Sequence, residues 1–334
     1  MKSAAWHLHR TWAGIVDGVT FSLVNMFHRR HFQAASSPEE VRAYLDEWPT
    51  ERRADFFSPK EIDMDEWPIV GADEHRIVFE TPFPDIFPEN NRAVFDFFPC
   101  AGTWERPIMF LLHGLMSVSD RGYRQWAKRI NEQGWHAVFV HLPYHYGRCP
   151  SGYLSGELAV GPHLRTVQGV RQAVVEVRSL IRWLHKKGVP YVGCWGMSYG
   201  GWVAALLAVC EPAVRCALLL EPIVDFEHAV WDSPASSALR GQLEKSGFTR
   251  DLIRELDGLV SPMLRKPCCD KEMVAVLAAE FDKVIPLQVA QSFAEKWGCP
   301  RFRCYRQGHV GYRLMREAFR EWSQELAPMI RDGK

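Results

Sequence analysis

The feature that most constrains this chain is a regular alternation of apolar runs and amphipathic segments between residues 107 and 326. Uninterrupted apolar runs such as Pro107–Leu112 and Tyr191–Trp195 are typical of strands that are buried on both faces. Between such runs lie segments such as Leu164–Lys187, in which valines and leucines recur on one side of a helix. The alternation predicts an α/β fold with a mostly parallel sheet covered by helices on both faces.

The remaining elements follow from similar patterns, and the first two expected strands alternate between apolar and polar residues. The expected strands are His75–Phe79, Arg92–Phe98, Pro107–Leu112, His136–Val140, Tyr191–Trp195, Ala213–Leu220, Met273–Ala279 and Arg301–Arg306. The expected helices are Ser37–Glu51, Arg121–Gln133, Leu164–Lys187, Trp202–Val209, Pro286–Trp297 and Arg313–Leu326. We expect an N-terminal helical extension over residues 1–70 and one domain over 71–334, with a cap-like helical insertion at about 226–267.

The N-terminal segment carries apolar residues at helical spacing, namely Trp12, Ile15, Val16, Val19, Leu23, Met26 and Phe27. Asp17 interrupts this run and no small-residue cleavage site follows it, which argues against a secretory signal. The segment is also too short and too mixed to span a bilayer. We expect a helix that packs on the body of the protein or on a second subunit, or that lies on a membrane surface as a peripheral contact.

Composition excludes several classes of function. The chain has 334 residues, and its 40 basic side chains balance 40 acidic ones, whereas proteins that bind nucleic acid generally carry a basic excess. The nine cysteines form no C-x-x-C motif, which predicts reduced thiols and a cytoplasmic location. The sequence has no H-E-x-x-H motif, and its closely spaced histidines lack the acidic or cysteine companions of metal sites. We therefore expect no metal and no cofactor.

A G-x-S-x-G motif, Gly196-Met197-Ser198-Tyr199-Gly200, lies between an expected strand and an expected helix. A serine on such a sharp strand-to-helix turn adopts strained backbone angles, and the residues two positions away must be small. In an open parallel sheet, ligands bind beyond the carboxyl ends of the strands, which is where this serine falls. Ser198 is therefore the candidate nucleophile.

A serine nucleophile needs a base, and the base needs an acid that orients it. His309 follows the last expected strand and is flanked by glycines, so it is the candidate base. Asp282 follows the strand before that and is the candidate acid, although its position also suits a helix N-cap. Glu221, which ends the strand after the elbow helix, is the alternative acid.

The tetrahedral intermediate needs backbone donors for its oxyanion. One candidate is the amide of Tyr199, directly after the nucleophile. The other is the amide of Leu115 or Met116, after the His113-Gly114 turn that ends the third expected strand. His113 itself is expected to be structural.

Two segments are expected to form the substrate pocket, one in the loop before residue 162 and one in the cap-like insertion. Their candidate contacts are Tyr144 and Arg148 in the first and Trp231 in the second, together with Met116. An Arg148 side chain that faced the serine would favour an acidic or phosphate-bearing substrate.

The order Ser198, Asp282, His309, with His113-Gly114 ahead of the nucleophile, resembles that of the α/β-hydrolase superfamily. The resemblance extends over about Asp73–Met329. It implies a central eight-stranded, mostly parallel sheet and acyl transfer by a Ser-His-Asp triad. The N-terminal extension and the insertion after Asp225 depart from the pattern and leave the pocket undefined.

The main hypothesis is a serine hydrolase that cleaves a small-molecule carboxylic ester through an acyl-enzyme on Ser198. A peptidase or amidase, or a hydrolase of lipid or thioester acyl groups, fits the same residues. The alternative from another class is a binding protein that uses a hydrolase pocket without turnover. The partners expected are an ester or acyl substrate and a second copy of the chain in an oligomer.

Overall fold

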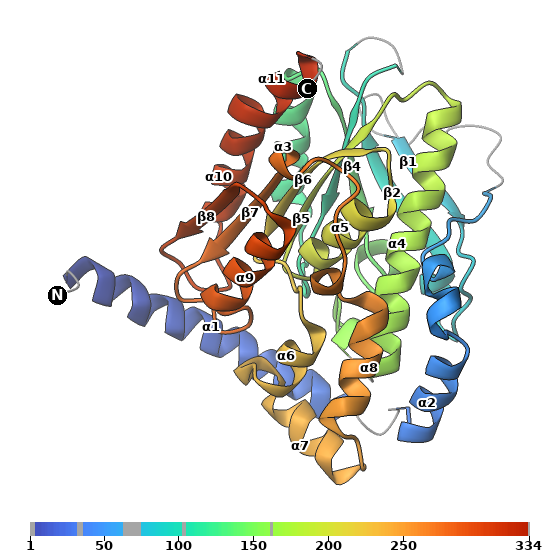
Figure 1. Cartoon of the computed structure of the whole chain (residues 1–334), viewed down its shortest axis with the longest axis vertical. Coiled ribbons are helices and arrows are strands. Elements are labelled where there is room, and N and C mark those ends of the chain that lie inside the picture. Colours follow the sequence, from blue (N-terminus) through green and yellow to red (C-terminus); the bar gives the residue numbers. More distant parts are fainter. Residues whose placement is uncertain (1–3, 32–35, 63–74, 102–104, 161–162, 333–334) are drawn as a thin grey trace.

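An eight-stranded sheet forms the centre of the molecule, in the strand order β1-β2-β4-β3-β5-β6-β7-β8 (Figure 1). The computed structural model describes residues 4–31, 36–62, 75–101, 105–160 and 163–332. The strands are β1 His75–Glu80, β2 Arg92–Phe98, β3 Ile108–Leu112, β4 His136–His141, β5 Val192–Met197, β6 Val214–Leu220, β7 Val274–Ala279 and β8 Arg301–Tyr305. Each lies within two residues of its predicted bounds.

The sheet is mostly parallel, as predicted. Only β2 runs antiparallel to its neighbours β1 and β4, and every other pair of adjacent strands is parallel. Leu112 of β3 pairs with Gly196 of β5, and Met197 of β5 pairs with Leu220 of β6. The carboxyl ends of these three strands therefore meet at one edge of the sheet, as ligand sites of open α/β sheets require.

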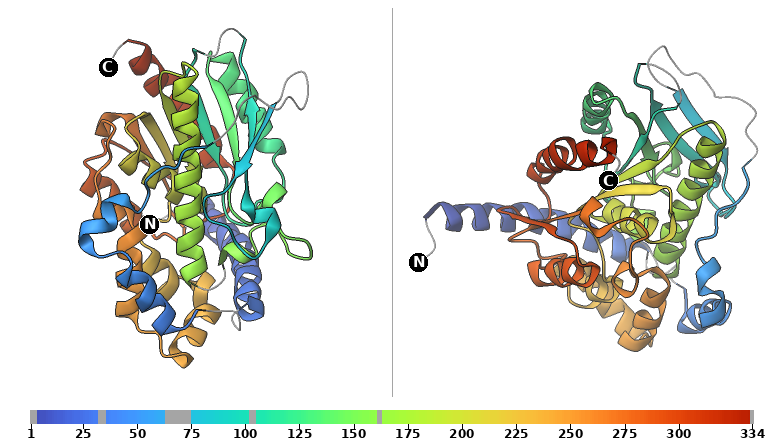
Figure 2. Two further views of the ribbon diagram at one scale, coloured as in Figure 1. Left: turned by 90° about the vertical axis from the view of Figure 1, so that its right-hand side faces the viewer. Right: turned by 45° about the horizontal axis from the view of Figure 1, so that its top comes forward.

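Helices cover both faces of the sheet (Figure 2). The helices are α1 Ala4–His31, α2 Pro38–Asp46, α3 Arg121–Glu132, α4 His163–Lys186, α5 Tyr199–Cys210, α6 Phe226–Trp231, α7 Ser237–Lys245, α8 Arg250–Val260, α9 Leu287–Trp297, α10 Arg313–Glu321 and α11 Ala327–Arg331. Apolar side chains of α3, α10 and α11 pack on one face, and those of α4, α5 and α9 pack on the other. This arrangement confirms the predicted fold class.

Two predicted segments differ from the structure. Helix α2 begins at a capping box between Ser37 and Glu40, as the Ser-Pro start suggests, but it ends at Asp46 rather than Glu51. Pro49 follows, and a separate 3-10 helix covers Thr50–Asp55. Strand β2 was expected to alternate, yet all its residues from Ala93 to Phe98 are buried, because helices and loops cover both of its faces.

The predicted insertion consists of α6, α7 and α8, which lie with α1 beyond one end of the sheet (Figure 1). Helix α1 packs on α7 and on the short 3-10 helices at Leu158–Val160 and Pro234–Ser236. The expected boundary between residues 70 and 71 falls outside the described residues. Within the described residues, no helix combines the length and the hydropathy that a bilayer span requires.

Helix α1 turns a different face to the body than its apolar pattern suggested. The residues buried against the body are Trp6, Ala13, Asp17, Phe21, Val24 and Phe27. Phe27 is the one buried residue among the apolar residues whose spacing predicted this helix. Others of that set face solvent: Trp12 is 68% exposed and Val19 is 61% exposed. The helix is apolar on two sides, so spacing alone does not identify the packed side.

Candidate active site

Ser198 lies on a strained turn between β5 and α5. Its backbone has φ 52° and ψ −113°, a conformation that side-chain-bearing residues rarely adopt. A Cβ atom on Gly196 would lie 2.1 Å from the carbonyl oxygen of Gly200, and one on Gly200 would lie 2.2 Å from that of Leu112. The turn can therefore form only with glycine at both positions, as expected for a nucleophile elbow.

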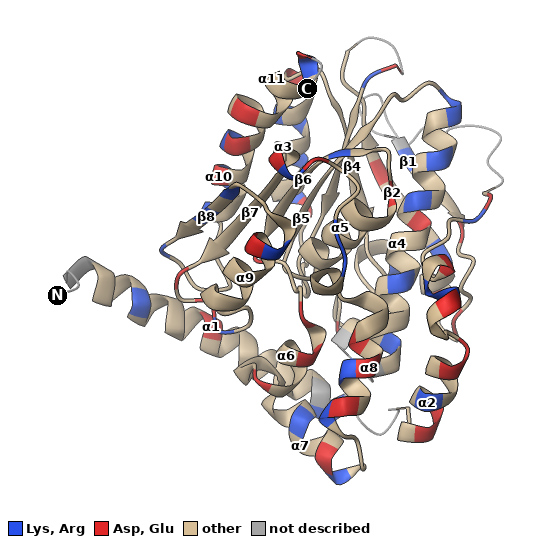
Figure 3. Ribbon diagram, in the orientation of Figure 1, with Lys and Arg blue, Asp and Glu red and all other residues tan. Residues whose placement is uncertain are grey.

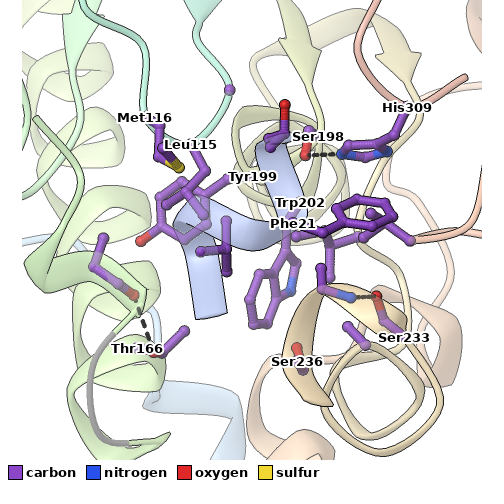
Figure 4. Close-up of a pocket in the computed structure, with 18 of the residues that line it drawn as sticks. Phe21, Leu115, Met116, Thr166, Ser198, Tyr199, Trp202, Ser233, Ser236 and His309 are labelled. Atoms are coloured by element: carbon purple, nitrogen blue, oxygen red, sulfur yellow. Dashed lines mark hydrogen bonds between the residues drawn. The ribbon is translucent and has the colours of Figure 1, made fainter. Parts of the chain in front are cut away.

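The structure brings the three predicted residues of the triad together. Ser198 Oγ lies 2.8 Å from His309 Nε2 (Figure 4). His309 Nδ1 lies 2.8 Å from Asp282 Oδ2. All three side chains are buried. The other carboxylate oxygen of Asp282 accepts hydrogen bonds from the backbone N–H groups of Val284 and Ile285, at 2.7 and 2.9 Å. Asp282 thus stabilises the turn before α9 and orients His309 at the same time.

The surroundings of His309 favour its protonated form. Burial lowers the pKa of the imidazole, but the adjacent Asp282 carboxylate, which also accepts a hydrogen bond, and the nearby Asp17 carboxylate raise it. The net effect is a pKa above the usual value for histidine. A base with this environment can accept a proton from Ser198 and hold it as an imidazolium.

Glu221, the alternative acid, lies close to the triad but does not bond to His309. Its Oε1 accepts a hydrogen bond from Gln307 at 3.1 Å, and its Oε2 has no partner among the described residues. Burial, together with the nearby Asp282 carboxylate, raises the pKa of Glu221 well above its usual range. The geometry therefore favours Asp282 as the partner of His309.

Glu221, Asp282 and His309 also place their ligand atoms within 4.8 Å of one another. Among the described residues, this is the one cluster of three side chains that could hold a metal ion. His309 Nδ1 and Asp282 Oδ2 already bond to each other, and the raised pKa of Glu221 favours its neutral form. Protonated carboxyls are poor ligands, so the donor set suits a triad better than a cation.

The predicted oxyanion donors border the same space. Leu115 and Tyr199 both line the cavity in front of Ser198, as does Met116, whose backbone has φ 58°. Tyr199 is the first residue of α5, so its amide lies at the positive end of a helix dipole. His113 is fully buried and bonds to the backbone of Gly114 and Leu142, which fits a structural role.

A cavity of about 350 Å³ opens in front of Ser198 and His309. Figure 4 shows that Leu115 and Met116 lie on one side of it and that Phe21 lies beside His309. None of the described residues that line it is Lys, Arg, Asp or Glu. The apolar walls are formed mainly by Phe21, Val24, Leu115, Trp202, Phe226 and Leu239.

Three of the predicted pocket residues lie elsewhere. Arg148 is buried, and its guanidinium bonds to Glu176 at 2.6 and 3.0 Å and to the carbonyl oxygens of His141 and Asn90. The Tyr144 hydroxyl donates to Asp85 and its ring borders a different cavity. Trp231 packs in the core beneath the cap helices. These assignments were wrong, because position in a loop or insertion does not reveal where a side chain points.

The structure adds site residues from α1 that the sequence did not identify. Thr20, Phe21, Leu23 and Val24 line the cavity, and Asp17 bonds to the backbone beside His309. The one signal in the sequence was the isolated aspartate in an apolar helical run. A charged side chain in such a run must find polar partners if that face is buried.

The strand order, the strained serine turn and the Ser198–His309–Asp282 geometry together define a protein of the α/β-hydrolase superfamily. A family model described as alpha/beta hydrolase domain containing 18 matches residues 60–230. The chain belongs to this family.

Other similarities show the fold without showing a substrate. Two uncharacterized proteins of Mycobacterium tuberculosis are each 28% identical over 214 residues, which is 62% of this chain and 50% of theirs. This chain thus spans about half the length of those relatives. An acetyl xylan esterase from a Paenibacillus species superimposes with a TM-score of 0.56 at 14% identity, over 86% of this chain and 92% of that one. An acylaminoacyl peptidase from Pyrococcus horikoshii superimposes with a TM-score of 0.53 at 11% identity, over 78% of this chain and 42% of that one.

Proposed function

We propose that this protein is a serine hydrolase that cleaves carboxylic esters with an uncharged, apolar acyl group. The observation that carries the proposal is the pair of 2.8 Å contacts that link Ser198 through His309 to Asp282, at the bottom of a cavity. Such a chain of contacts activates a hydroxyl that is otherwise a poor nucleophile.

In the proposed reaction, Ser198 Oγ attacks the ester carbonyl and gives its proton to His309 Nε2. The Asp282 carboxylate holds the other ring nitrogen and stabilises the imidazolium. The amides of Tyr199 and Leu115 stabilise the oxyanion of the tetrahedral intermediate. His309 then protonates the leaving alcohol, and a water molecule that His309 deprotonates releases the acid from Ser198.

The cavity supports an uncharged, apolar acyl group as the substrate moiety. The described residues of its walls include no Lys, Arg, Asp or Glu, so a carboxylate or phosphate inside it would lose its hydration with no cationic partner other than His309. Its volume, about 350 Å³, is at the lower end of the range for small-molecule sites. With Arg148 bonded to Glu176, the reason for expecting an acidic substrate disappears.

The test combines a covalent probe with a substrate series. We expect a fluorophosphonate probe to label the wild type on Ser198 and to leave Ser198→Ala unlabelled. Among p-nitrophenyl esters, kcat/KM should rise from acetate to hexanoate by up to about fourfold per added methylene, which corresponds to ~0.8 kcal/mol of apolar burial. The hemisuccinate ester, with its charged acyl group, should react more slowly than the butyrate.

The same experiment separates the alternatives. Absence of labelling on Ser198 would indicate a binding protein without turnover. Faster cleavage of matched p-nitroanilides than of esters would indicate an amidase or peptidase. Preference for phospholipids or acyl thioesters over the p-nitrophenyl series would assign a lipid or thioester hydrolase instead.

A further inference from the structure

We propose that Asp17 of helix α1 is a positioning residue of the active site, and that it fixes the backbone of the loop that carries the base His309. The proposal rests on the proposed function, since it takes His309 as the base. It also assigns a role to the N-terminal extension, which the triad itself does not require.

The Asp17 carboxylate makes two hydrogen bonds to the loop that carries His309. Its Oδ2 accepts from the backbone N–H of His309, and its Oδ1 accepts from the backbone N–H of Val310, both at 3.0 Å. The loop lies between the end of β8 and the start of α10, and among the described residues the N–H groups of His309 and Val310 have no backbone acceptor. Asp17 is only 1% exposed, and within the described residues of α1 it is the one acidic side chain. Burial raises the pKa of the Asp17 carboxyl above its usual value, although the hydrogen bonds from Val310 and His309 act in the opposite direction. Hydrogen bonds from backbone N–H groups to a carboxylate are among the stronger ones in proteins.

The fit between the carboxylate and the loop is close. A Cβ atom on Gly308 would lie 2.6 Å from Asp17 Oδ2 and 2.8 Å from Oδ1. Gly308 does not have a positive φ, so its backbone conformation does not require glycine. Glycine is needed here because the Asp17 carboxylate approaches the backbone so closely. The two positions form a matched pair, with the acid on α1 and the space for it on the loop.

Helix α1 is anchored on either side of Asp17, so the carboxylate is held in place. Toward the N-terminus, Trp6 Nε1 donates to Glu280 at 2.6 Å. Toward the C-terminus, Asn25 Oδ1 accepts from the backbone of Ala238 at 2.7 Å, and Asn25 Nδ2 donates to the carbonyl oxygen of Pro234 at 3.2 Å. Because α1 is fastened at several points and also packs on α7 and on two 3-10 helices, the loss of the Asn25 bonds alone should leave Asp17 in place beside the loop of His309.

Two carboxylates face His309, namely Asp282 from the loop after β7 and Asp17 from α1. Glu221, at the end of β6, approaches Asp282 and bonds to Gln307 rather than to the imidazole. Removal of the Asp17 charge should therefore destabilise the imidazolium and lower the pKa of His309. A residue that merely filled space would not have this effect.

The experiment compares full-length wild type with Asp17→Asn and with Asn25→Ala as the matched control. Asn25→Ala removes hydrogen bonds that fasten the same helix but leaves the His309 loop intact. With p-nitrophenyl butyrate over pH 5 to 9, Asp17→Asn should lower kcat at least about tenfold with KM changed little, and should move the acidic limb of kcat/KM to lower pH. Asn25→Ala should keep kcat within about twofold and leave that limb unmoved.

A second readout does not depend on turnover. Amide hydrogen exchange, followed by mass spectrometry, should speed up in the peptide that contains His309 in Asp17→Asn and stay unchanged there in Asn25→Ala. If the wild type is not labelled by the fluorophosphonate probe, the proposed function fails, and exchange still decides whether Asp17 holds the loop. If both variants behave alike, or if Asp17→Asn matches the wild type in kcat, pH limb and exchange, the positioning role is wrong.

Discussion

At the scale of single residues, two buried carboxyls lie near the same histidine in different surroundings. Asp282 accepts two backbone hydrogen bonds and a third interaction from His309. Glu221 has one amide donor from Gln307, and its other oxygen has no partner within the described residues. Donors stabilise an ionised carboxylate, whereas burial without them favours the neutral acid. Burial and the nearby Asp282 carboxylate therefore raise the pKa of Glu221 well above its usual range.

This difference predicts opposite outcomes for two isosteric substitutions. Asp282→Asn should lower kcat by roughly 10³- to 10⁴-fold, because the amide cannot hold His309 in the required tautomer. Glu221→Gln should stay within about threefold of wild type, since Glu221 does not contact the imidazole. Steady-state kinetics on one ester substrate, with circular dichroism to check folding, measures both. The reverse pattern would make Glu221 the triad acid.

Glu221 should also make the stability of the protein depend on pH. The pKa of Glu221 in the folded state lies well above its ordinary value, which the unfolded chain has. At a pH between these two pKa values, the folded state keeps a proton that the unfolded chain has lost. The free energy of unfolding then falls as pH rises through that interval, by up to about 1.4 kcal/mol per pH unit. Glu221→Gln removes this penalty.

We therefore expect Glu221→Gln to be more stable than wild type at pH 8, and to show a smaller advantage at pH 5. Urea denaturation at the two pH values measures the difference. An advantage that does not change with pH would mean that Glu221 is ionised in the folded protein.

Single residues also show where sequence reasoning reaches its limit. Ser198, Asp282 and His309 could be predicted because each follows a recognisable strand, and the ends of parallel strands converge. Asp17 could not be assigned to the site because it is 292 residues from His309 along the chain, and no local pattern connects them. Arg148 was placed wrongly because its burial against Glu176 depends on a helix that follows it by 28 positions.

At the scale of elements, the crossing of α5 over the end of β3 determines the backbone geometry at Ser198. Gly200 lies in the first turn of α5, directly against the backbone of Leu112 and His113. Because both partners are backbone, neither can move aside as a flexible side chain would. The close approach of helix to strand is what places Ser198 on the wall of the cavity.

We predict that Gly200→Ala destabilises the protein by at least about 3 kcal/mol, since its Cβ would overlap main-chain atoms. Gly241→Ala is the matched control, because Gly241 lies inside helix α7 with nothing within 4 Å of an added Cβ. That change should stabilise by roughly 0.5–1 kcal/mol through helix propensity. Urea denaturation measures the free energy of unfolding of both variants. Equal changes in the two would contradict the overlap between a Cβ atom at position 200 and the main chain.

The strands were easier to predict than the faces of the helices. A strand such as β3 is apolar at every position because it is buried on both sides, so its bounds are visible in the sequence. Helix α1 is apolar on two sides, and only the three-dimensional fold determines which side contacts the body. The cap helices were predicted as a group, while Trp231 turned inward to the core rather than to the cavity.

At the scale of the whole molecule, α1 leaves an apolar stripe uncovered. Leu8, Trp12, Ile15, Val19, Leu23 and Met26 are all at least 40% exposed along one side of the helix. Figure 3 shows few charged residues along this helix, whose N-terminal half extends past the body in Figure 1. The predicted contact of α1 with a membrane surface or a second subunit stays a prediction, and this stripe is the surface that would make it.

The double variant Trp12→Asp/Ile15→Asp should weaken that contact at least about tenfold, because each buried side chain of this size contributes roughly 1.5–3 kcal/mol. Vesicle co-sedimentation and sedimentation velocity together distinguish a lipid surface from a second copy of the chain. Val118→Asp, at an exposed apolar residue outside α1, is the control. Equal behaviour of wild type and double variant in both assays would mean that the stripe has no partner of either kind.

The nine cysteines are all free thiols. The cytoplasmic location inferred from them stays a prediction. Fractionation of cells that produce the protein, followed by detection of labelled Ser198, would test it.

The hydrogen bonds between Asp17 and the loop of His309 join residues that lie 292 and 293 positions apart in the sequence. During synthesis, the ribosome therefore makes the carboxylate long before it makes the loop that the carboxylate holds. A nascent chain in which residue 309 has not yet been translated carries the anchor but lacks the proposed base. The proposed hydrolysis cannot begin until translation has passed this residue.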